Sequence, residues 1–426
     1  MKIIKGRSTF FRNTLTLLSG TVIAQAIPIL LSPVLSRIYT TEDFAILAII
    51  TPFITIGAII ANLRLDIALV IPKEDDEARK LMSLALLFNL LTVLLSVIGV
   101  FIFNFFFSKH TFFSESAIKL LWYIPAGIFA LGWYTAFNYW STRNKTYKNN
   151  ATSKIVQSVI NISVCIIFGY FKPGAEGLVL GLVLGYILGL CVLIFKHKNN
   201  FPISFKINKN RKKLKDVLVK YKNFIFINTP HASIGTFVDQ GIVYFLKIFF
   251  PNNIIGAFSF GYRYTKAPLG IITSSLSQVF YEDAAKKANE GIDIRPLMFK
   301  IQKNLFIFSF PFYIIGLIWA PEIFSFVFSA EYYTAGEVAS LLLPWIYLSF
   351  LVSPFSSVTL IFNKQKESFL LCIIDLVLRI TAVILGGISG DWTITFYFLS
   401  FICSIYHIFV AYWYYRISNP NKINRY

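Results

Sequence analysis

Charged residues stand inside several long apolar stretches of this sequence, where they could bind ions. Arg64 and Asp66 lie within "ANLRLDIALVIPK", and Arg263 and Lys266 lie within "GYRYTKAP". A charge at the centre of a spanning helix costs about 3 kcal/mol on insertion scales, so charges retained there usually face a partner or a watery cavity. Arginine and lysine in such a place suit an anionic ligand, and aspartate suits a proton or a cation.

The spacing of two of these pairs gives different expectations. Asp375 and Arg379 are four residues apart and share one helix face, so two interpretations stay open: an ion pair that stabilises its own helix, or a substrate contact by Arg379. Arg64 and Asp66 are two residues apart and would point about 200 degrees away from each other on one helix. At least one of them is expected to face a cavity or another helix, unless Arg64 extends to the cytoplasmic interface.

Arg263 and Lys266 are three residues apart on one helix face, where like charges repel. A pair of inward-facing cations therefore predicts a visiting anion. Asp239, in "TFVDQGIVYF", is the nearest candidate counter-ion in sequence. Asp66 and Asp239 are the buried carboxylates without a same-face partner, so we also expect one of them to bind a coupling proton or sodium ion.

Apolar runs of about 20 residues place these charges in a membrane. The 426-residue chain is 56% hydrophobic and only 14% charged, and no short alternating strands of a β-barrel are visible in it. We predict an all-α integral membrane protein with about twelve transmembrane helices. The runs place the spans at residues 13–36, 44–71, 80–107, 117–141, 154–171, 176–195, 223–250, 255–281, 302–329, 338–362, 367–389 and 391–415.

The spans divide into two lobes of six around a basic interval. Residues 1–196 form the predicted N-terminal lobe, 197–222 a cytoplasmic linker and 223–426 the C-terminal lobe. A shift of 210 residues lays "SRIYTTEDFAILAII" over "LKIFFPNNIIGAFSF" and superposes the first two spans on the seventh and eighth. Two lobes of the same orientation indicate a parallel repeat around a central cavity, as in rocker-type transporters.

The distribution of lysine and arginine predicts the orientation in the membrane. One set of alternate loops holds most of them, ten between Lys196 and Lys222, and the other set has only Arg37, Lys109, Lys119 and Lys172. Both termini are therefore expected in the cytoplasm. This topology explains the net charge of +19 without nucleic-acid binding. The basic interval could also bind anionic lipid headgroups, but a positive-inside linker is favoured.

The N-terminal segment has some features of a secretory signal. "MKIIKGRSTFFRN" precedes an apolar run and "AQA". The apolar run continues beyond this potential cleavage site, which favours a first transmembrane helix.

The sequence offers little for covalent chemistry. Its four cysteines lie in apolar spans without paired spacing, and it has no Walker A loop, HExxH or GxSxG motif. The acidic run "KEDDEARK" lacks metal-ligand spacing and suits the N-terminus of the third helix. We expect no enzymatic activity, cofactor or metal site.

Three segments resemble the oligosaccharide flippases of the Wzx type, in the superfamily of the MATE exporters and the lipid II flippase. They are "LLSGTVIAQAIPILLSPVLSRIYTTEDFAILA", "RLDIALVIPKEDDEA" and "GAFSFGYRYTKAPLGIITSSLSQVFYEDAAK". The resemblance implies two six-helix lobes in a bacterial inner membrane. It also implies transfer of an undecaprenyl-diphosphate-linked oligosaccharide from the cytoplasmic to the periplasmic leaflet, for O-antigen, capsule or another surface polysaccharide, beside the polysaccharide polymerase machinery.

The side chains fit such a substrate. A diphosphate needs fixed cations, for which Arg64, Arg263, Lys266 and Arg379 are the candidates, and sugars need polar and aromatic surface. Polar candidates are Gln25, Asn62, Asn138, Gln157 and Gln240. The aromatic run "WYTAFNYW" is expected to belong mostly to the membrane interface or the core.

Alternating access without covalent chemistry is the predicted mechanism. Arg64 would meet the headgroup in the inward-open state, and Arg263 with Lys266 in the outward-open state; alternatively, either site is an ion pair that holds helices together. A competing function is a MATE-like exporter of small organic cations, which would need a mainly acidic cavity. A polymerase or ligase would need a large periplasmic loop, and the longest predicted one is short.

Overall fold

The computed structural model describes residues 19–106, 115–171, 174–198, 201 and 211–418. Nine of the described helices are long and apolar enough to cross a membrane. The remaining predicted spans correspond to the described first helix Ser19–Leu35, to a broken seventh span and to α13 (Asn252–Asn289). The predicted all-α membrane fold is confirmed. The cations of residues 2–12 and residues 202–210 of the basic interval lie outside the described residues.

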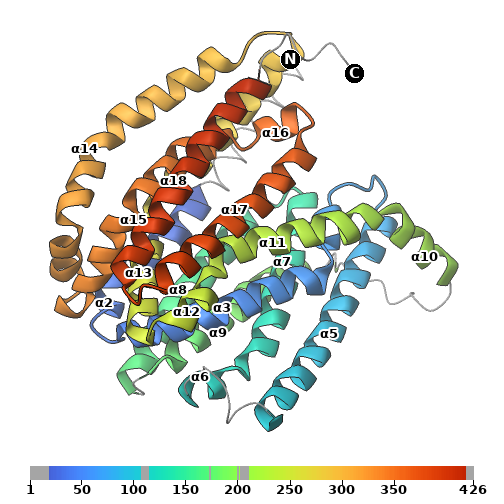
Figure 1. Cartoon of the computed structure of the whole chain (residues 1–426). Helices are drawn as coiled ribbons and strands as arrows, with labels where there is room; N and C mark the ends of the chain where they lie inside the picture. The colour runs from blue at the N-terminus through green and yellow to red at the C-terminus, as the bar shows by residue number, and fades with distance from the viewer. Residues whose placement is uncertain (1–18, 107–114, 172–173, 199–200, 202–210, 419–426) are drawn as a thin grey trace. The chain divides into compact units, whose positions relative to one another are not determined.

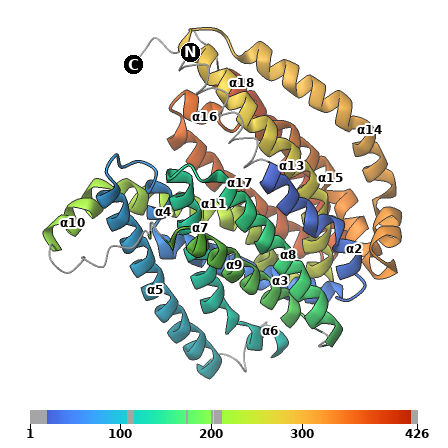
Figure 2. The same ribbon diagram turned by 180° about the vertical axis from the view of Figure 1, so that it is seen from behind.

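The N-terminal compact unit, residues 1–241, is organised around α7. α7 (Tyr123–Arg143) packs against α3 (Thr41–Asn62), α5 (Asp75–Phe106) and α9 (Glu176–Lys196), as Figures 1 and 2 show. The other described elements of this unit are α2 (Ser32–Leu35), α4 (Leu65–Ala68), α6 (Glu115–Leu120), α8 (Tyr147–Phe171), α10 (Arg211–Lys220), the π-helical turn Phe224–Asn228 and α11 (Thr229–Gln240).

The C-terminal compact unit, residues 242–426, is organised around α15. α15 (Tyr333–Val352) packs against α13, α14 (Arg295–Val327) and α18 (Trp392–Ile417). The remaining elements of this unit are α12 (Ile242–Phe249), α16 (Val358–Ile361), α17 (Gln365–Gly387) and the 3-10 turns Ala330–Tyr332 and Ser353–Phe355.

The two units repeat one arrangement of helices. A shift of 210 residues carries Tyr123, where α7 begins, onto Tyr333, where α15 begins. The neighbours of these two central helices correspond as well, because α3, α5 and α9 around α7 match α13, α14 and α18 around α15. In each unit the last two long helices also pair, α8 with α9 and α17 with α18. The predicted parallel repeat is confirmed.

The second span ends earlier than predicted. α3 begins at a capping box, in which the Thr40 hydroxyl accepts from the Asp43 backbone N–H and the Asp43 carboxylate accepts from the Thr40 N–H. It ends at Asn62 instead of residue 71, because Leu63 and Arg64 adopt left-handed backbone conformations with φ of 50° and 55°. Arg64 and Asp66 therefore do not share one continuous helix, and the expected angle of about 200 degrees between them is wrong.

The seventh span is broken. The predicted single helix of residues 223–250 is a π-helical turn, α11 and α12, with a break at Gly241, a residue of low helix propensity. α11 packs against α3, and the Thr55 hydroxyl donates a hydrogen bond of 2.9 Å to Gln240 Oε1. The boundary of the compact units thus lies at Gly241, inside the predicted span, and lobes bounded at residues 196 and 223 remain a prediction.

A turn at Gly390 and Asp391 separates the last two long helices, α17 and α18. Gly390 adopts a φ of 73°, which favours glycine, and Asp391 caps α18 by accepting from the Thr393 N–H at 2.8 Å. The hydrogen bond from the Thr393 hydroxyl, together with its backbone N–H, holds the pKa of the Asp391 carboxyl below its usual range.

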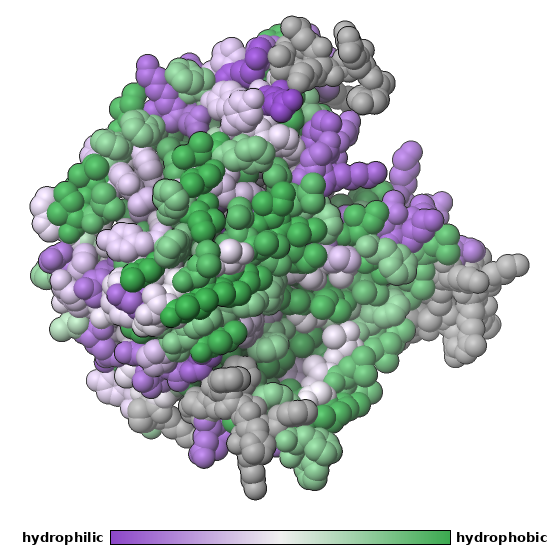
Figure 3. Space-filling view, in the orientation of Figure 1, coloured by the Kyte–Doolittle hydropathy of each residue, from purple (hydrophilic) through white to green (hydrophobic). Residues whose placement is uncertain are grey.

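α5 and α14 present apolar side chains outward. On α5 these exposed residues are Leu87, Leu90, Leu91, Leu94, Leu95, Val97, Ile98, Phe101, Ile102, Phe105 and Phe106. Figure 3 shows hydrophobic side chains gathered over α5. An apolar surface of this extent on a membrane helix suits contact with lipid.

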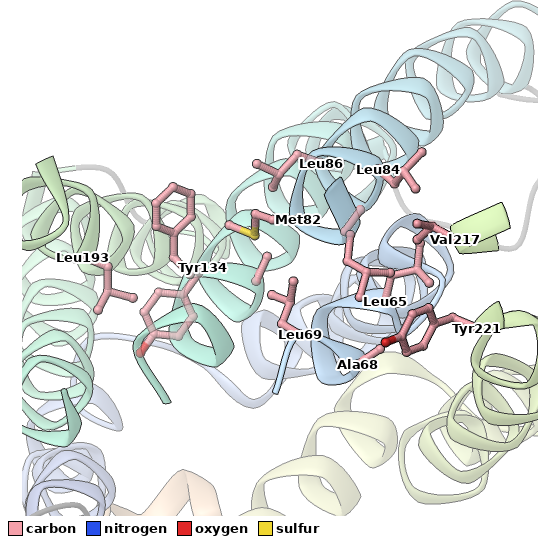
Figure 4. Close-up of a cluster of buried hydrophobic side chains, with 14 of the residues drawn as sticks. Leu65, Ala68, Leu69, Met82, Leu84, Leu86, Tyr134, Leu193, Val217 and Tyr221 are labelled. Atoms are coloured by element: carbon pink, nitrogen blue, oxygen red, sulfur yellow. The ribbon is translucent and has the colours of Figure 1, made fainter. Parts of the chain in front are cut away.

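A hydrophobic cluster in the N-terminal unit packs around α4. Leu65, Ala68 and Leu69 are fully buried there, against side chains of α5 and against Val217 and Tyr221 at the end of the basic interval (Figure 4). The acidic first turn of α5 adds an ion pair of 2.6 Å between Glu77 and Lys220. α4 is thereby held in a packed environment although the chain on its N-terminal side is strained.

Arg143, the last residue of α7, fastens the loop between α4 and α5. Its Nη1 donates to the Leu69 carbonyl at 3.0 Å and also to the Pro72 carbonyl, and its Nη2 donates to Asp75 Oδ1 at 2.8 Å. The arginine side chain is only 9% exposed, whereas that of Asp75 is 71% exposed. The carbonyl contacts are therefore expected to matter more than the ion pair.

Changing Arg143 to glutamine is expected to lower the free energy of unfolding by about 1.5–3 kcal/mol, since charged hydrogen bonds are lost and the carbonyls are left without their donor. Asp75→Asn, which keeps those carbonyl contacts, should cost less than about 1 kcal/mol. Unfolding of the detergent-purified variants measures both. Equal losses would show that the ion pair, and not the carbonyl contacts, holds the loop.

Candidate substrate and ion sites

The C-terminal unit contains a cavity of about 140 Å³ between α13, α15 and α17. Its polar lining consists of Tyr262, Lys266, Thr273, Ser349, Ser353 and Arg379, with Trp345 among the apolar residues. A cavity of this volume is smaller than the pockets of about 300–1,000 Å³ that hold drug-sized ligands. The volume is enough for one phosphate or part of one sugar ring, and too little for a whole oligosaccharide.

Two aromatic rings in this cavity stand between two cations. Tyr262 and Trp345 stack with their ring centroids 5.3 Å apart. The Lys266 ammonium lies 4.9 Å from the centroid of Tyr262 and donates to its hydroxyl at 2.8 Å. The Arg379 guanidinium lies 4.6 Å from the centroid of Trp345. The hydrogen bond to Tyr262 fixes the position of Lys266, and the cation–π contact with Trp345 helps to fix that of Arg379.

The helices reach this arrangement through a close crossing of α13 and α15. Gly261 permits it, because a Cβ there would come within 2.5 Å of the Ala335 carbonyl oxygen. Tyr262 follows directly, and Lys266 lies one helical turn further on the same face. Trp345 of α15 is only 2% exposed, so its ring is fixed by its surroundings. Positioned cations beside hydroxyl groups suit an anionic ligand that also carries hydroxyls.

Arg379 also forms the ion pair that its spacing predicted. Its Nε donates to Asp375 Oδ1 at 2.9 Å, and its Nη2 donates to Asp375 Oδ2 at 2.7 Å. Both side chains are almost completely buried. The interpretation as an ion pair on its own helix is confirmed, and the same guanidinium also lines the cavity.

The structure separates Arg263 from Lys266. Arg263 is exposed, lies 5.8 Å from the ring centroid of Tyr264 and does not line the cavity, whereas Lys266 does. The cavity predicted between the two lobes is a different site, so the expectation that both residues face it together stays a prediction. Side chains three residues apart on a helix differ in direction by about 60 degrees around its axis. This is enough for Lys266 to line the cavity of the C-terminal unit while Arg263 does not.

In the N-terminal unit, Asp66 lies in a buried polar network. The carboxylate is 4% exposed and accepts from the Ile67 N–H at 2.9 Å and from Asn62 Nδ2 at 3.4 Å. Asn62 also donates to the Gly132 carbonyl at 2.8 Å and to Thr135 Oγ1 at 3.1 Å, and accepts from Asn89 Nδ2 at 3.3 Å. No ion pair within 4.0 Å of Asp66 exists in the part of the chain that the structure describes.

Space for this network depends on Gly132. A Cβ there would lie 2.1 Å from Asn89 Nδ2 and 3.1 Å from Asn62 Oδ1. Asn89 is fully buried, and its Oδ1 has no hydrogen-bond partner among the described residues. A buried amide oxygen without a donor is costly, so the network is not fully satisfied as it stands.

Arg64 lies at the strained break beside this network. Its side chain is half-buried, and its buried Nε has no hydrogen-bond acceptor among the residues described. Asp66, Tyr139 of α7 and His231 of α11 are near enough to interact with it electrostatically. The cation and the anion of this segment are thus neighbours that do not pair.

The other predicted site residues lie in varied surroundings. Gln25 is exposed, and Asn138 is half-buried and donates to the Tyr134 carbonyl at 3.1 Å. Asp239 lies on the exposed surface of α11, and its role in ion coupling stays a prediction. Trp140 of the aromatic run is almost fully buried, in agreement with a core role.

Several residues of these sites were missed at the level of sequence. Tyr262 precedes Lys266 by four residues, a spacing that places both on one helix face and could have identified it. Trp345 and Asn89 are distant in sequence from the charges that they accompany. Their roles depend on helix packing, which no local pattern encodes.

A family profile described as "Polysaccharide biosynthesis protein" matches residues 34–337, well over half of the chain. The chain belongs to the polysaccharide biosynthesis family. Among curated proteins, no sequence gives a significant match. The matched residues include the Arg64–Asp66 break, the network around Asn62 and the Lys266 helix, but end before Arg379.

Solved structures of transporters share the fold of this polysaccharide biosynthesis protein. One is the lipid II flippase MurJ in an inward closed conformation, with a TM-score of 0.73, 16% identity, and coverage of 94% of this chain and 87% of that one. Another is an inward-facing multidrug resistance MATE transporter of the MOP superfamily, with a TM-score of 0.71, 15% identity, and coverage of 95% and 96%. The predicted resemblance is confirmed, and the chain is a multi-pass membrane protein with the fold of these transporters and flippases.

Proposed function

We propose that this protein is a flippase that moves undecaprenyl-diphosphate-linked oligosaccharide repeat units from the cytoplasmic to the periplasmic leaflet. It would work by alternating access in a bacterial inner membrane, with both termini in the cytoplasm, and would supply the polymerase of O-antigen, capsule or another surface polysaccharide. Its family membership and its flippase-like fold support this function.

The observation that carries the proposal is the cavity of the C-terminal unit. Lys266 and Arg379 line it on either side of a stacked tyrosine and tryptophan, together with three hydroxyl side chains. Fixed cations suit the phosphates of a lipid-linked sugar or an acidic sugar, and hydroxyls suit its polar groups. The polyprenyl chain needs no site of its own, because it can stay in the lipid.

A MATE-like exporter of small organic cations is the alternative, and the fold is compatible with it. The charge of the cavity argues against that alternative, because Lys266 would repel a cationic ligand and the charge of Arg379 is balanced by Asp375. Asp375 is engaged in two hydrogen bonds with Arg379.

Further residues remain part of the proposal. Arg64 and Arg263 would contact the headgroup in different states, and Gln25, Asn62 and Asn138 would offer polar contacts to the saccharide. A proton or sodium gradient could drive the cycle through Asp66 or Asp239. No covalent step is required of any of these groups, so the protein would act without a cofactor.

Deleting the gene is expected to abolish the surface polysaccharide while lipid-linked repeat units accumulate inside the cell. Mass spectrometry of the lipid-linked sugars measures this and also gives their composition. A strain carrying the wild-type gene on a plasmid is the control. If the repeat units were not made at all, the protein would be a transferase, and if a cationic drug accumulated instead, the exporter function would hold.

A further inference from the structure

The Arg64–Asp66 segment holds two opposite charges that do not pair. Asp66 is buried and hydrogen-bonded only by neutral groups, while the buried Nε of Arg64 has no acceptor among the described residues. A buried carboxylate without an ion pair is costly, and the neighbouring guanidinium would offset part of that cost if the two groups met. The conformation of the local backbone keeps the two side chains apart.

The strained turn before α4 supplies that separation. Leu63 and Arg64 both adopt left-handed conformations, which are unfavourable for residues with a Cβ and persist only where the surroundings impose them. The surroundings are well defined on both sides. Asn62 is fixed by Gly132 and Thr135 of α7, and Leu65 is fully buried in the cluster around α4.

We infer that Arg64 binds an anionic group of the substrate and that Asp66 takes up a proton when it does, so that the two binding events favour each other. This inference rests on the proposed function. It adds that binding of the headgroup at Arg64 is coupled to protonation of Asp66. A phosphate at Arg64 adds negative charge beside the Asp66 carboxylate, and a second anion nearby raises the proton affinity of a carboxyl group. By linkage, a protonated Asp66 then raises the affinity of Arg64 for the anion by the same factor.

The other ionisable groups around this segment are accounted for. Tyr139 and His231 face Arg64 from α7 and α11. The charges at the start of α5 are engaged elsewhere: Asp75 contacts Arg143, Asp76 contacts Lys80, and Glu77 contacts Lys220. Arg79 of α5 donates to the Phe201 carbonyl at 2.7 Å. His231 is therefore the group that must be separated from Asp66 by experiment.

The test uses sulfate as the probe, because sulfate keeps its charge between about pH 5.5 and about pH 8 while Asp66 and His231 can change theirs. Sulfate affinity of the purified full-length chain is measured by calorimetry at both pH values. The wild type is expected to bind sulfate at least about 5-fold more tightly at the lower pH than at the higher pH. His231→Gln, Asp239→Asn and the exposed control Asp76→Asn should keep this ratio, whereas Asp66→Asn and Arg64→Gln should lose it.

A second measurement needs no variant and remains decisive if Asp66→Asn does not fold. Adding sulfate to the wild type in weak buffer should cause net proton uptake, read with a pH electrode. Absence of uptake, or a pH ratio that persists in Asp66→Asn, overturns the inference. A ratio lost in Asp239→Asn or His231→Gln assigns the proton elsewhere and overturns it too. These results test the roles of Arg64 and Asp66 and leave the flippase function itself open, because that function depends on the sugars that accumulate in the deletion strain.

Discussion

Replacing Arg379 with leucine is expected to lower the free energy of unfolding by about 3–5 kcal/mol, because it leaves the buried Asp375 carboxylate without its partner. The two side chains are only 8% and 10% exposed, so water cannot replace the lost contacts. The double variant Asp375→Leu/Arg379→Leu should recover most of the loss, since apolar residues often substitute for a buried ion pair without cost. The free energies of unfolding of the two single variants and the double variant, measured in detergent, complete a double-mutant cycle.

The matched control is the pair of Lys364 and Glu367, whose side chains are 40% and 47% exposed. Lys364→Leu should change the free energy of unfolding by less than about 1 kcal/mol. The folded double variant at 375 and 379 also separates two roles of Arg379. If it flips lipid-linked sugars normally, Arg379 is purely structural; if it folds but fails to flip them, Arg379 contacts the substrate.

Much of the fold could be predicted because a membrane imposes its own length on a helix. Apolar runs located the spans, and the 210-residue shift laid the second span on the eighth, where the structure has α3 and α13. The second and seventh spans were predicted as unbroken helices, and each of these two errors has a local cause. The end of α3 depends on the left-handed Leu63 and Arg64, which have no glycine or proline to mark them. The break at Gly241 carried a weak signal, since a single glycine is tolerated in membrane helices.

The candidate sites were predictable only as separate charges. The spacing of Asp375 and Arg379 was enough to predict their pairing, because both lie on one helix. Whether Lys266 or Arg263 reaches the cavity depends on how α13 meets α15, a contact that requires Gly261 opposite Ala335. The same holds for Asn62, whose partners come from α5 and α7. Tertiary packing determines these contacts, and a single sequence does not reveal it.

Changing Lys266 to glutamine is expected to slow flipping by about 10-fold or more, as for the loss of a charged contact worth at least about 1.5 kcal/mol. The Lys266 ammonium lines the cavity, and its hydrogen bond to the Tyr262 hydroxyl holds it in place. Lys266→Arg should retain part of the activity, because it keeps the charge. Tyr262→Phe should fall between them, because it removes the hydrogen bond of 2.8 Å and keeps the ring. Transfer of lipid-linked sugars in proteoliposomes measures the rates.

Lys287→Gln is the control for this series, since Lys287 lies on the same helix and pairs with Asp283 at 3.4 Å outside the cavity. It should flip at the wild-type rate. The stringent form of the experiment changes Arg64, Arg263 and Lys266 together to glutamine, which removes the proposed headgroup cations outside the Asp375 pair. A correctly inserted triple variant that still flips at a normal rate would mean that positive charge at these positions does not recognise the substrate. If the triple variant flips slowly and restoring Lys266 alone returns the wild-type rate, recognition of the substrate is assigned to the cavity between α13 and α15.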